Sequence, residues 1–151
     1  MVEAVACDGK KADTMQTWIT VVAGALHRSD GRWLMQRRPV GKHHAGLWEF
    51  PGGKVEGGEM PLHSLVRELS EELGILSHAE LCAPAGFAEG AGTNGQPGLV
   101  ILLYTVGGWD GEPQSLEGGE VRWFTPGEVL ALDKPPLDVG LAERLFANIP
   151  I

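Results

Sequence analysis

Three glutamates in one short segment have the side chains and the spacing for metal-assisted chemistry. Glu68, Glu71 and Glu72 lie at positions i, i+3 and i+4, so a helix would place their carboxylates on one face. Like charges at these spacings repel by roughly a few tenths of a kcal/mol, and nothing in a helix requires that repulsion for folding. Clustered carboxylate oxygens suit Mg²⁺ or Mn²⁺, which also bind substrate phosphates. The alternative interpretation is an ordinary solvated acidic face.

Features on the N-terminal side of these glutamates favour the metal site. A turn at Gly52-Gly53 would let backbone carbonyls approach a ligand closely, because glycine has no Cβ. Nearby basic residues could hold phosphates, namely Arg37, Arg38 and Lys54. Acidic and basic groups in this arrangement predict a metal-dependent phosphoryl-transfer site.

The glutamates must be positioned by a helix, which the pattern predicts over residues 61–73. Pro61 suits its first turn, and Gly74 ends it after Leu73. Its apolar side chains fall within an arc of roughly 100° that would face the core. They are Leu62, Leu65, Val66, Leu69 and Leu73. The glutamates occupy the adjacent arc and therefore stay accessible to a ligand.

The remaining pattern predicts one mixed α/β domain over residues 17–151, preceded by a loosely ordered extension over 1–16. A hairpin is expected around the Asp30-Gly31 turn signal, with strands over 18–26 and 32–37. Further strands are expected over 47–50, 80–87, 99–106 and 121–124. Two more helices are expected over 126–132 and 139–147.

Composition excludes several classes of protein and of partner. Acidic residues outnumber basic ones 20 to 12 in a chain of 151 residues, for a net charge of −8, which argues against binding nucleic-acid polymers. There is no apolar run of roughly 20 residues to span a membrane and no signal-peptide core. Only two cysteines occur, Cys7 and Cys82, so we expect a reducing, cytoplasmic compartment. A small phosphate ligand remains compatible, because a metal ion can offset local negative charge.

One segment resembles a known family motif. Residues 53–75, GKVEGGEMPLHSLVRELSEELGI, resemble the complete Nudix box, G-x5-E-x7-R-E-U-x-E-E-x-G-U, with U an apolar residue. All nine fixed positions match: Gly53, Glu59, Arg67, Glu68, Leu69, Glu71, Glu72, Gly74 and Ile75. Residues 36–56, 109–124 and 135–145 are similar to MutT-type nucleoside triphosphate pyrophosphohydrolases. The resemblance implies a Nudix α/β/α sandwich with a mixed β-sheet and the box as a loop–helix–loop.

The resemblance also implies which residues bind metal and move protons. The implied metal ligands are one carbonyl and four carboxylates, from Gly52, Glu68, Glu71, Glu72 and Glu117. Glu117 lies in the loop 114–119, where Glu120 is a close rival and an ordinary loop glutamate is the alternative. Either Glu68 or Glu117 would act as general base on the attacking water. Mg²⁺, or Mn²⁺, is the expected cofactor.

Other residues are implied to bind substrate or to support the site. Arg38 and Lys54 would contact phosphates, and His43 would lie near the nucleotide; for each, an ordinary solvated side chain is the alternative. Arg67 and Glu59 are interpreted as structural, because a planar guanidinium can bridge carboxylates and hold the loop against the helix.

Asp138 aligns with a position that reads the base. In enzymes resembling the 8-oxo-dGTP hydrolases the residue is Asn, and in those resembling the CTP and 5-methyl-dCTP hydrolases it is Asp. An ionised Asp only accepts hydrogen bonds, which favours a base with an amino group such as cytosine. Because 8-oxoguanine also carries N–H donors, both substrates stay open. The alternative role for Asp138 is a helix N-cap.

The expected function is hydrolysis of a nucleoside or deoxynucleoside triphosphate to the monophosphate and pyrophosphate, by water attack at the β-phosphorus. It would serve nucleotide-pool sanitation or CTP and 5-methyl-dCTP hydrolysis. The expected partner is a small nucleotide, with no nucleic-acid polymer or membrane, and the chain would be a monomer or a weak homodimer. Alternatives are a Nudix hydrolase of another substrate such as ADP-ribose, or a non-catalytic nucleotide-binding module. The module is disfavoured because the box keeps all its glutamates.

Overall fold

Strand β1 (Trp18–Leu26) lies at the centre of the larger of two main sheets in a computed structural model that describes residues 17–147. It pairs in parallel with β7 (Gly98–Val106) along its whole length and antiparallel with β4 (Gly52–Lys54). β6 (Cys82–Gly90) lies antiparallel to β7 and completes the order β4-β1-β7-β6. The sheet is therefore mixed, as predicted. The extension predicted for residues 1–16 lies outside the described residues.

The second sheet corrects the predicted hairpin. Its order is β3-β2-β9, built from Trp48–Glu49, Trp33–Arg37 and Glu120–Phe124. The predicted turn forms, since the N–H of Arg28 donates to the carbonyl of Arg32 and the N–H of Gly31 donates to the carbonyl of Arg28, and a bridge between His27 and Trp33 lies just beyond the end of β1. β1 and β2 do not continue as a ladder, and β2 instead pairs along its length with β9. The physical reason is that both edges of β1 are already paired, with β7 along its whole length and with β4 over residues 21–23. Both faces of β2 are buried, because Met35 packs in one core cluster and Leu34 in the other.

The Gly52-Gly53 segment is a strand and not the predicted turn. Gly52 lies opposite Ala23 in the ladder between β4 and β1. A Cβ built on Gly52 would lie 1.9 Å from the carbonyl oxygen of Val22, so only glycine fits so close to β1. The structure also contains a two-residue ladder between β5 (Leu76–Ser77) and β8 (Trp109–Asp110). This ladder was not predicted, because two residues are too few to show an alternating apolar pattern.

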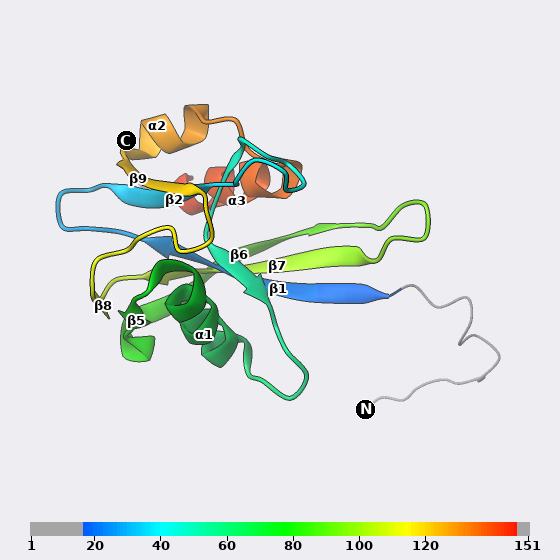
Figure 1. Ribbon diagram of the computed structural model, residues 1–151, viewed down its shortest axis with the longest axis horizontal. Helices are drawn as coiled ribbons and strands as arrows, with labels where there is room; N and C mark the ends of the chain where they lie inside the picture. Colours follow the sequence, from blue (N-terminus) through cyan, green and yellow to red (C-terminus); the bar gives the residue numbers. More distant parts are fainter. Residues whose placement is uncertain (1–16, 148–151) are drawn as a thin grey trace.

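Helices cover both sides of the sheets (Figure 1). Helix α1 (Pro61–Leu73) has the predicted bounds, with proline in its first turn and Gly74 at its C-cap with φ of 71°. α2 (Pro126–Ala131) and α3 (Pro136–Phe146) lie on the opposite side. α3 begins three residues earlier than predicted because Pro136 opens it. The strand predicted from Glu80 begins at Cys82, after the short 3₁₀ helix η3 (Ala79–Leu81). The α/β/α sandwich is confirmed.

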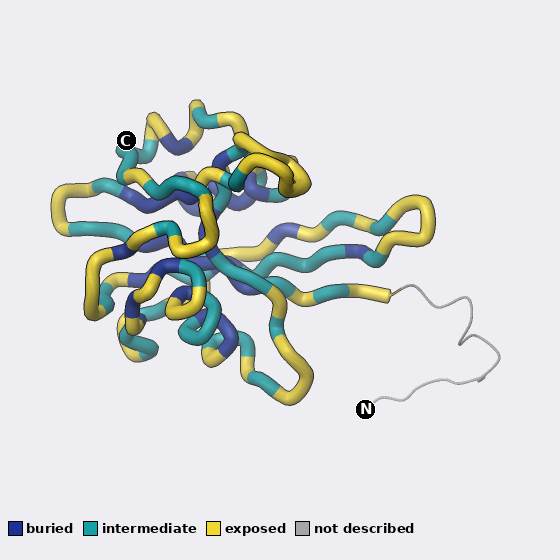
Figure 2. The backbone as a smooth tube through the Cα atoms, viewed as in Figure 1, coloured by how far each residue is buried: buried dark blue, intermediate teal, exposed yellow. Residues whose placement is uncertain are grey.

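The core consists of two clusters, one under α1 and one under α2 and α3. Buried segments, dark blue in Figure 2, lie mainly in the strands and on the helices between the exposed loops. Successive β1 side chains point to opposite faces, so Val22 packs with Leu65 and Leu69 of α1, whereas Ala23 packs with Leu141 of α3. In the apolar arc predicted for α1, Leu65, Leu69 and Leu73 are buried, whereas Leu62 and Val66 are half-buried, and the glutamates lie on the adjacent side of the helix. Within residues 17–147, no helix combines the length and apolar character needed to cross a membrane.

Candidate active site

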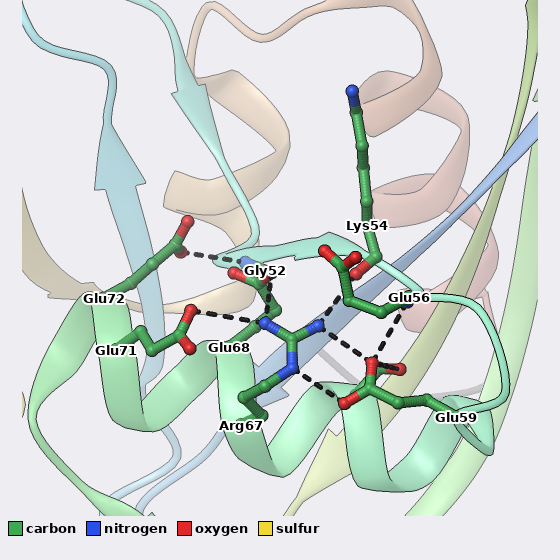
Figure 3. Close-up of polar contacts among 9 residues, drawn as sticks. Gly52, Lys54, Glu56, Glu59, Arg67, Glu68, Glu71 and Glu72 are labelled. Atoms are coloured by element: carbon green, nitrogen blue, oxygen red, sulfur yellow. Dashed lines mark hydrogen bonds and ion pairs between the residues drawn. The ribbon is translucent and has the colours of Figure 1, made fainter.

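Arg67, on α1, connects the helix to the loop that precedes it (Figure 3). Its Nε and Nη2 donate to the two carboxylate oxygens of Glu59 over 2.8 and 2.9 Å, and Nη2 also donates to the carbonyl of Lys54. Glu59 further accepts from the hydroxyl of Ser64 and the N–H of Glu56. The bonds from Arg67, followed by these two, lower the pKa of Glu59 to about 2. The expected structural role of this pair agrees with the contacts.

The same guanidinium contacts two of the predicted metal ligands. Nη1 of Arg67 donates to Glu68 over 3.0 Å and to Glu71 over 3.2 Å. Glu68 is mostly buried, while the Glu71 side chain is 56% exposed. Across the described part of the chain, no group of three or more His, Cys, Asp or Glu side chains converges in a metal-binding arrangement. The glutamates share one helical face, but two of them are turned toward Arg67.

Glu72 joins α1 to strand β4. Its Oε1 accepts the backbone N–H of Gly52 over 3.2 Å, so the contact involves the N–H of Gly52, whereas the predicted metal ligand is its carbonyl. Burial raises the pKa of Glu72 to about 8, and the charges of Glu68, Glu117 and Glu49 add to the effect. Burial raises the pKa of Glu68 as well.

The chemistry of this donor set fits a divalent cation, because Glu68 and Glu72 are desolvated carboxylates whose pKa is also raised by the charge of Glu117, and carboxylate oxygens are the ligands that Mg²⁺ and Mn²⁺ prefer. The backbone at Gly53 packs closely against one of these carboxylates. A Cβ on Gly53 would lie 2.2 Å from the carboxyl carbon of Glu68, so the glycine leaves the space that this carboxylate occupies. Lys54, the next residue, extends its ammonium away from the Arg67 contacts (Figure 3).

The loop that carries Glu117 is docked on the C-terminal end of α1. The N–H groups of Gln114 and Leu116 donate to the carbonyls of Leu73 and Glu72 over 3.1 and 3.0 Å, which satisfies acceptors left free at a helix end. The charge of Glu117 contributes to the raised pKa of both Glu68 and Glu72. The rival Glu120 instead pairs with Arg37 over 2.6 Å and with Arg122.

A cleft of about 680 Å³ is lined by residues of β1, β7 and the start of α3, and none of the predicted metal-binding carboxylates lines it. All four predicted substrate-binding residues line it: Arg38, His43, Lys54 and Asp138. Its apolar lining includes Val21, Leu99 and Ile101. A narrower cavity of about 160 Å³ shares Arg38 and Asp138 with this cleft and reaches Glu72. The two spaces therefore adjoin at shared lining residues. Of the predicted metal ligands, Gly52 and Glu72 line the smaller cavity, and Glu68, Glu71 and Glu117 line neither space.

Arg38 has a partner that the sequence interpretation missed. Its Nη1 donates to both carboxylate oxygens of Glu49, over 2.9 and 3.1 Å, and its Nε donates to the carbonyl of His43. Burial raises the pKa of Glu49, and Arg38 opposes that shift. The available signal was a charged residue inside the apolar run 47–50, since a buried charge requires a partner. His44, also missed, lines the same cleft.

Asp138 lies in the first turn of α3 but is not its N-cap. Pro135 holds the N-cap position, so the N-cap alternative is wrong. The Asp138 residue is 6% exposed, and its Oδ2 accepts the backbone N–H of Phe50 over 3.1 Å. Burial raises the pKa of Asp138 to about 7; the bond from Phe50 opposes this shift, and the charge of Glu49 adds to it. A buried carboxylate with one oxygen already bonded thus forms part of the cleft wall.

The fold is an α/β/α sandwich in which one helix carries three glutamates near a cleft. This combination is typical of one class of hydrolase. The model of the NUDIX domain matches residues 17–145. The chain belongs to the Nudix family and is a MutT-like Nudix hydrolase, an enzyme of a family that generally uses a divalent metal.

Named relatives match over a similar length of the chain. The CTP pyrophosphohydrolase of Escherichia coli K12 is 38% identical over 131 residues, which is 85% of this chain and 92% of the relative. The 8-oxo-dGTP diphosphatase of Haemophilus influenzae is 37% identical over 131 residues, 85% of this chain and 91% of the relative.

Solved structures agree with the fold. The solution structure of the E. coli ORF135 protein superimposes with a TM-score of 0.77 at 34% identity, covering 87% of this chain and 91% of that one. A MutT structure from a study of Aliivibrio salmonicida and Vibrio cholerae gives 0.74 at 29% identity, covering 88% of this chain and 100% of that one.

Proposed function

We propose that this protein hydrolyses a nucleoside or deoxynucleoside triphosphate to the monophosphate and pyrophosphate. The observation that carries the proposal is that the cleft lined by Arg38, His43, Lys54 and Asp138 shares Arg38 and Asp138 with the cavity that reaches Glu72. A nucleotide in the cleft would direct its phosphates toward the acidic face. The names of the two relatives, a CTP pyrophosphohydrolase and an 8-oxo-dGTP diphosphatase, support this substrate class.

Mg²⁺, or Mn²⁺, is the proposed cofactor, held by the carboxylates of Glu68, Glu71, Glu72 and Glu117 with the carbonyl of Gly52. When bound, the ion neutralises phosphate charge and lowers the pKa of a bound water. Glu72 must then lose its proton, because its pKa is about 8. Glu68 and Glu71 can keep their contacts with Arg67, since Nη1 occupies only one oxygen of each carboxylate and leaves the other oxygen for the ion.

The chain's own residues supply positioning and proton transfer. Arg38 and Lys54 orient the triphosphate and offset its charge. Glu68 or Glu117 takes a proton from water as the water oxygen bonds to the β-phosphorus. The bond between the β-phosphorus and the oxygen bridging to the α-phosphorus breaks, so the monophosphate and pyrophosphate leave. No covalent intermediate with the protein is required.

Base recognition rests on Asp138 and favours cytosine first. Ionised Asp138 only accepts hydrogen bonds, and one of its oxygens already receives the Phe50 amide. The other oxygen would accept from the exocyclic amine of cytosine in CTP or 5-methyl-dCTP. A second candidate is 8-oxo-dGTP, as in nucleotide-pool sanitation, because that base also offers N–H donors to Asp138.

The test compares kcat/KM for CTP, 5-methyl-dCTP, 8-oxo-dGTP, dGTP and ADP-ribose with Mg²⁺, since this ratio measures discrimination between substrates. Reaction in ¹⁸O-water should place the label in pyrophosphate, which identifies attack at the β-phosphorus. Glu72→Gln should lower kcat roughly 100-fold or more, whereas Glu80→Gln, on an exposed residue outside the site, should leave it unchanged. Turnover of ADP-ribose without any triphosphate would overturn the substrate class. Absence of all turnover would favour a binding module.

A further inference from the structure

The ammonium of Lys134 is enclosed by backbone carbonyls between α2 and α3. Its Nζ donates to the carbonyl oxygens of Val129, Leu132 and Leu130 over 2.7, 2.8 and 3.3 Å. An ammonium has three N–H donors, so these acceptors use all of them. The carbonyls lie at and just beyond the C-terminal end of α2, where a positive charge is favourable. Lys134 therefore holds the connection between α2 and α3 against the C-terminal end of α2.

That connection also holds strand β3. The N–H of Trp48 donates to the carbonyl of Asp133 over 2.9 Å, and the N–H of Phe50 donates to Oδ2 of Asp138 over 3.1 Å. Residues 133–138 thus accept two alternate amides of the segment 48–50, one through a backbone carbonyl and one through a side-chain carboxylate. Lys134 lies between these two anchor points in the chain.

The anchored segment forms one wall of the substrate cleft. Pro135, Pro136, Leu137 and Asp138 line the cleft, whereas Lys134 is not one of its lining residues. Lys134 therefore acts on a nucleotide in the cleft through this segment and through its charge near Asp138. Three charged groups surround Asp138 from different elements: Glu49 from β3, Arg38 from the end of β2, and Lys134 from the connection.

We propose that Lys134 is a positioning residue for base recognition, which holds the carboxylate of Asp138 against the Phe50 amide by fixing the connection between α2 and α3. The proposal rests on the proposed role of Asp138 in reading the base. Its geometric basis, the three carbonyl contacts of Lys134 and the two amide contacts of β3, exists without a nucleotide.

Kinetics of Lys134→Met test the proposal first. Methionine keeps much of the aliphatic stem and removes both the charge and the donors. The KM for the preferred triphosphate should rise about tenfold while kcat changes less than about twofold, because coupled residues show interaction energies of roughly 0.5–3 kcal/mol. Lys134→Arg, which keeps the charge and several donors, should restore most of the affinity. An equal loss in both variants, or a loss confined to kcat, would overturn the proposal.

A double-mutant cycle separates positioning from general destabilisation. In an Asp138→Asn background, Lys134→Met should change KM by less than about twofold, because the group on which Lys134 acts has already been replaced. If Lys134→Met changes KM by the same factor in the Asp138→Asn background as in the wild type, Lys134 acts independently of Asp138 and the proposal is wrong.

Amide hydrogen exchange of the substrate-free protein gives an independent readout. Lys134→Met should speed exchange at the Phe50 and Trp48 amides about tenfold through local opening, while amides of β1 keep their rates. Lys134→Gln serves if the methionine variant does not fold. Unchanged exchange at Phe50 would overturn the anchoring itself. Faster exchange at Phe50 combined with normal nucleotide kinetics in Asp138→Asn would uphold the anchoring and refute only the proposed role of Asp138.

Discussion

Arg67 and Glu59 are joined by two parallel hydrogen bonds, of 2.8 and 2.9 Å, between the guanidinium and both carboxylate oxygens. The same guanidinium reaches Glu68 and Glu71 through its remaining nitrogen. One residue thus sets both the position of the loop before α1 and the orientation of two glutamates on its acidic face.

Arg67→Lys should therefore impair catalysis more than folding. A lysine ammonium cannot make the planar two-bond contact with Glu59, so the loop and the glutamates lose their common anchor. We expect kcat/KM to fall roughly 10- to 100-fold, as is typical of small misplacements of catalytic groups. Steady-state kinetics and a thermal melt measure the two effects. Arg28→Lys is the matched control, since Arg28 pairs with Asp30 on the surface and such pairs contribute little.

The metal-free protein should lose stability as the pH rises from about 5 to about 8. Glu72 has a pKa of about 8 in the folded chain against 4.5 as its ordinary value, so between these values the folded state binds more protons than the unfolded state. Glu72→Gln keeps an oxygen for the Gly52 amide but cannot ionise. In EDTA its melting temperature should depend less on pH, and it should exceed the wild-type value by about 3 °C or more at pH 8. A wild-type melting temperature that rises over this range would contradict the assignment.

Added Mg²⁺ should reverse that pH trend. Binding requires deprotonated ligands, and a ligand that binds only the folded state stabilises it. The rise in melting temperature on adding Mg²⁺ should be larger at pH 8 than at pH 6, and it should be lost in Glu68→Gln. The control is Glu80→Gln, which should retain the full effect. An equal rise at both pH values would mean that Glu72 does not bind the ion.

Glu117 and Glu120 can be distinguished by kinetics. Glu117→Gln should lower kcat roughly 100-fold with little change in KM, whether it binds the metal or accepts the proton. Glu120→Gln should stay within about threefold, because Glu120 is engaged with Arg37 and Arg122 on the surface. If Glu120→Gln lowers kcat more than Glu117→Gln does, the catalytic role belongs to Glu120.

Affinity for CTP should weaken as the pH falls through about 7. Burial raises the pKa of Asp138 to about 7, and the protonated form replaces one of its acceptor sites with a donor. The wild-type KM should therefore rise on the acidic side of this value. Asp138→Asn should show a flatter profile over the same range. A wild-type KM that is constant from about pH 6 to about pH 8 would exclude ionised Asp138 as the acceptor.

The order of residues by itself determined the helix 61–73 and its glutamate face. A helix places residues three and four apart on one side wherever it forms, so the apolar arc of α1, its end at Gly74 and the grouping of the glutamates follow from local spacing. The nine matched positions of the box identified the family for the same reason, since they lie within 23 consecutive residues, 53–75.

Only the tertiary structure decided which distant segments meet. β2 pairs with β9 and not with β1, and Phe50 meets Asp138 across 88 positions of the chain. Arg38 pairs with Glu49, and Lys134 binds carbonyls at the end of α2 next to the segment that carries Asp138. Such contacts depend on burying both faces of each strand and on pairing each buried polar group. The free energy of these contacts depends on the assembled sandwich, so it cannot be deduced from a short window of sequence.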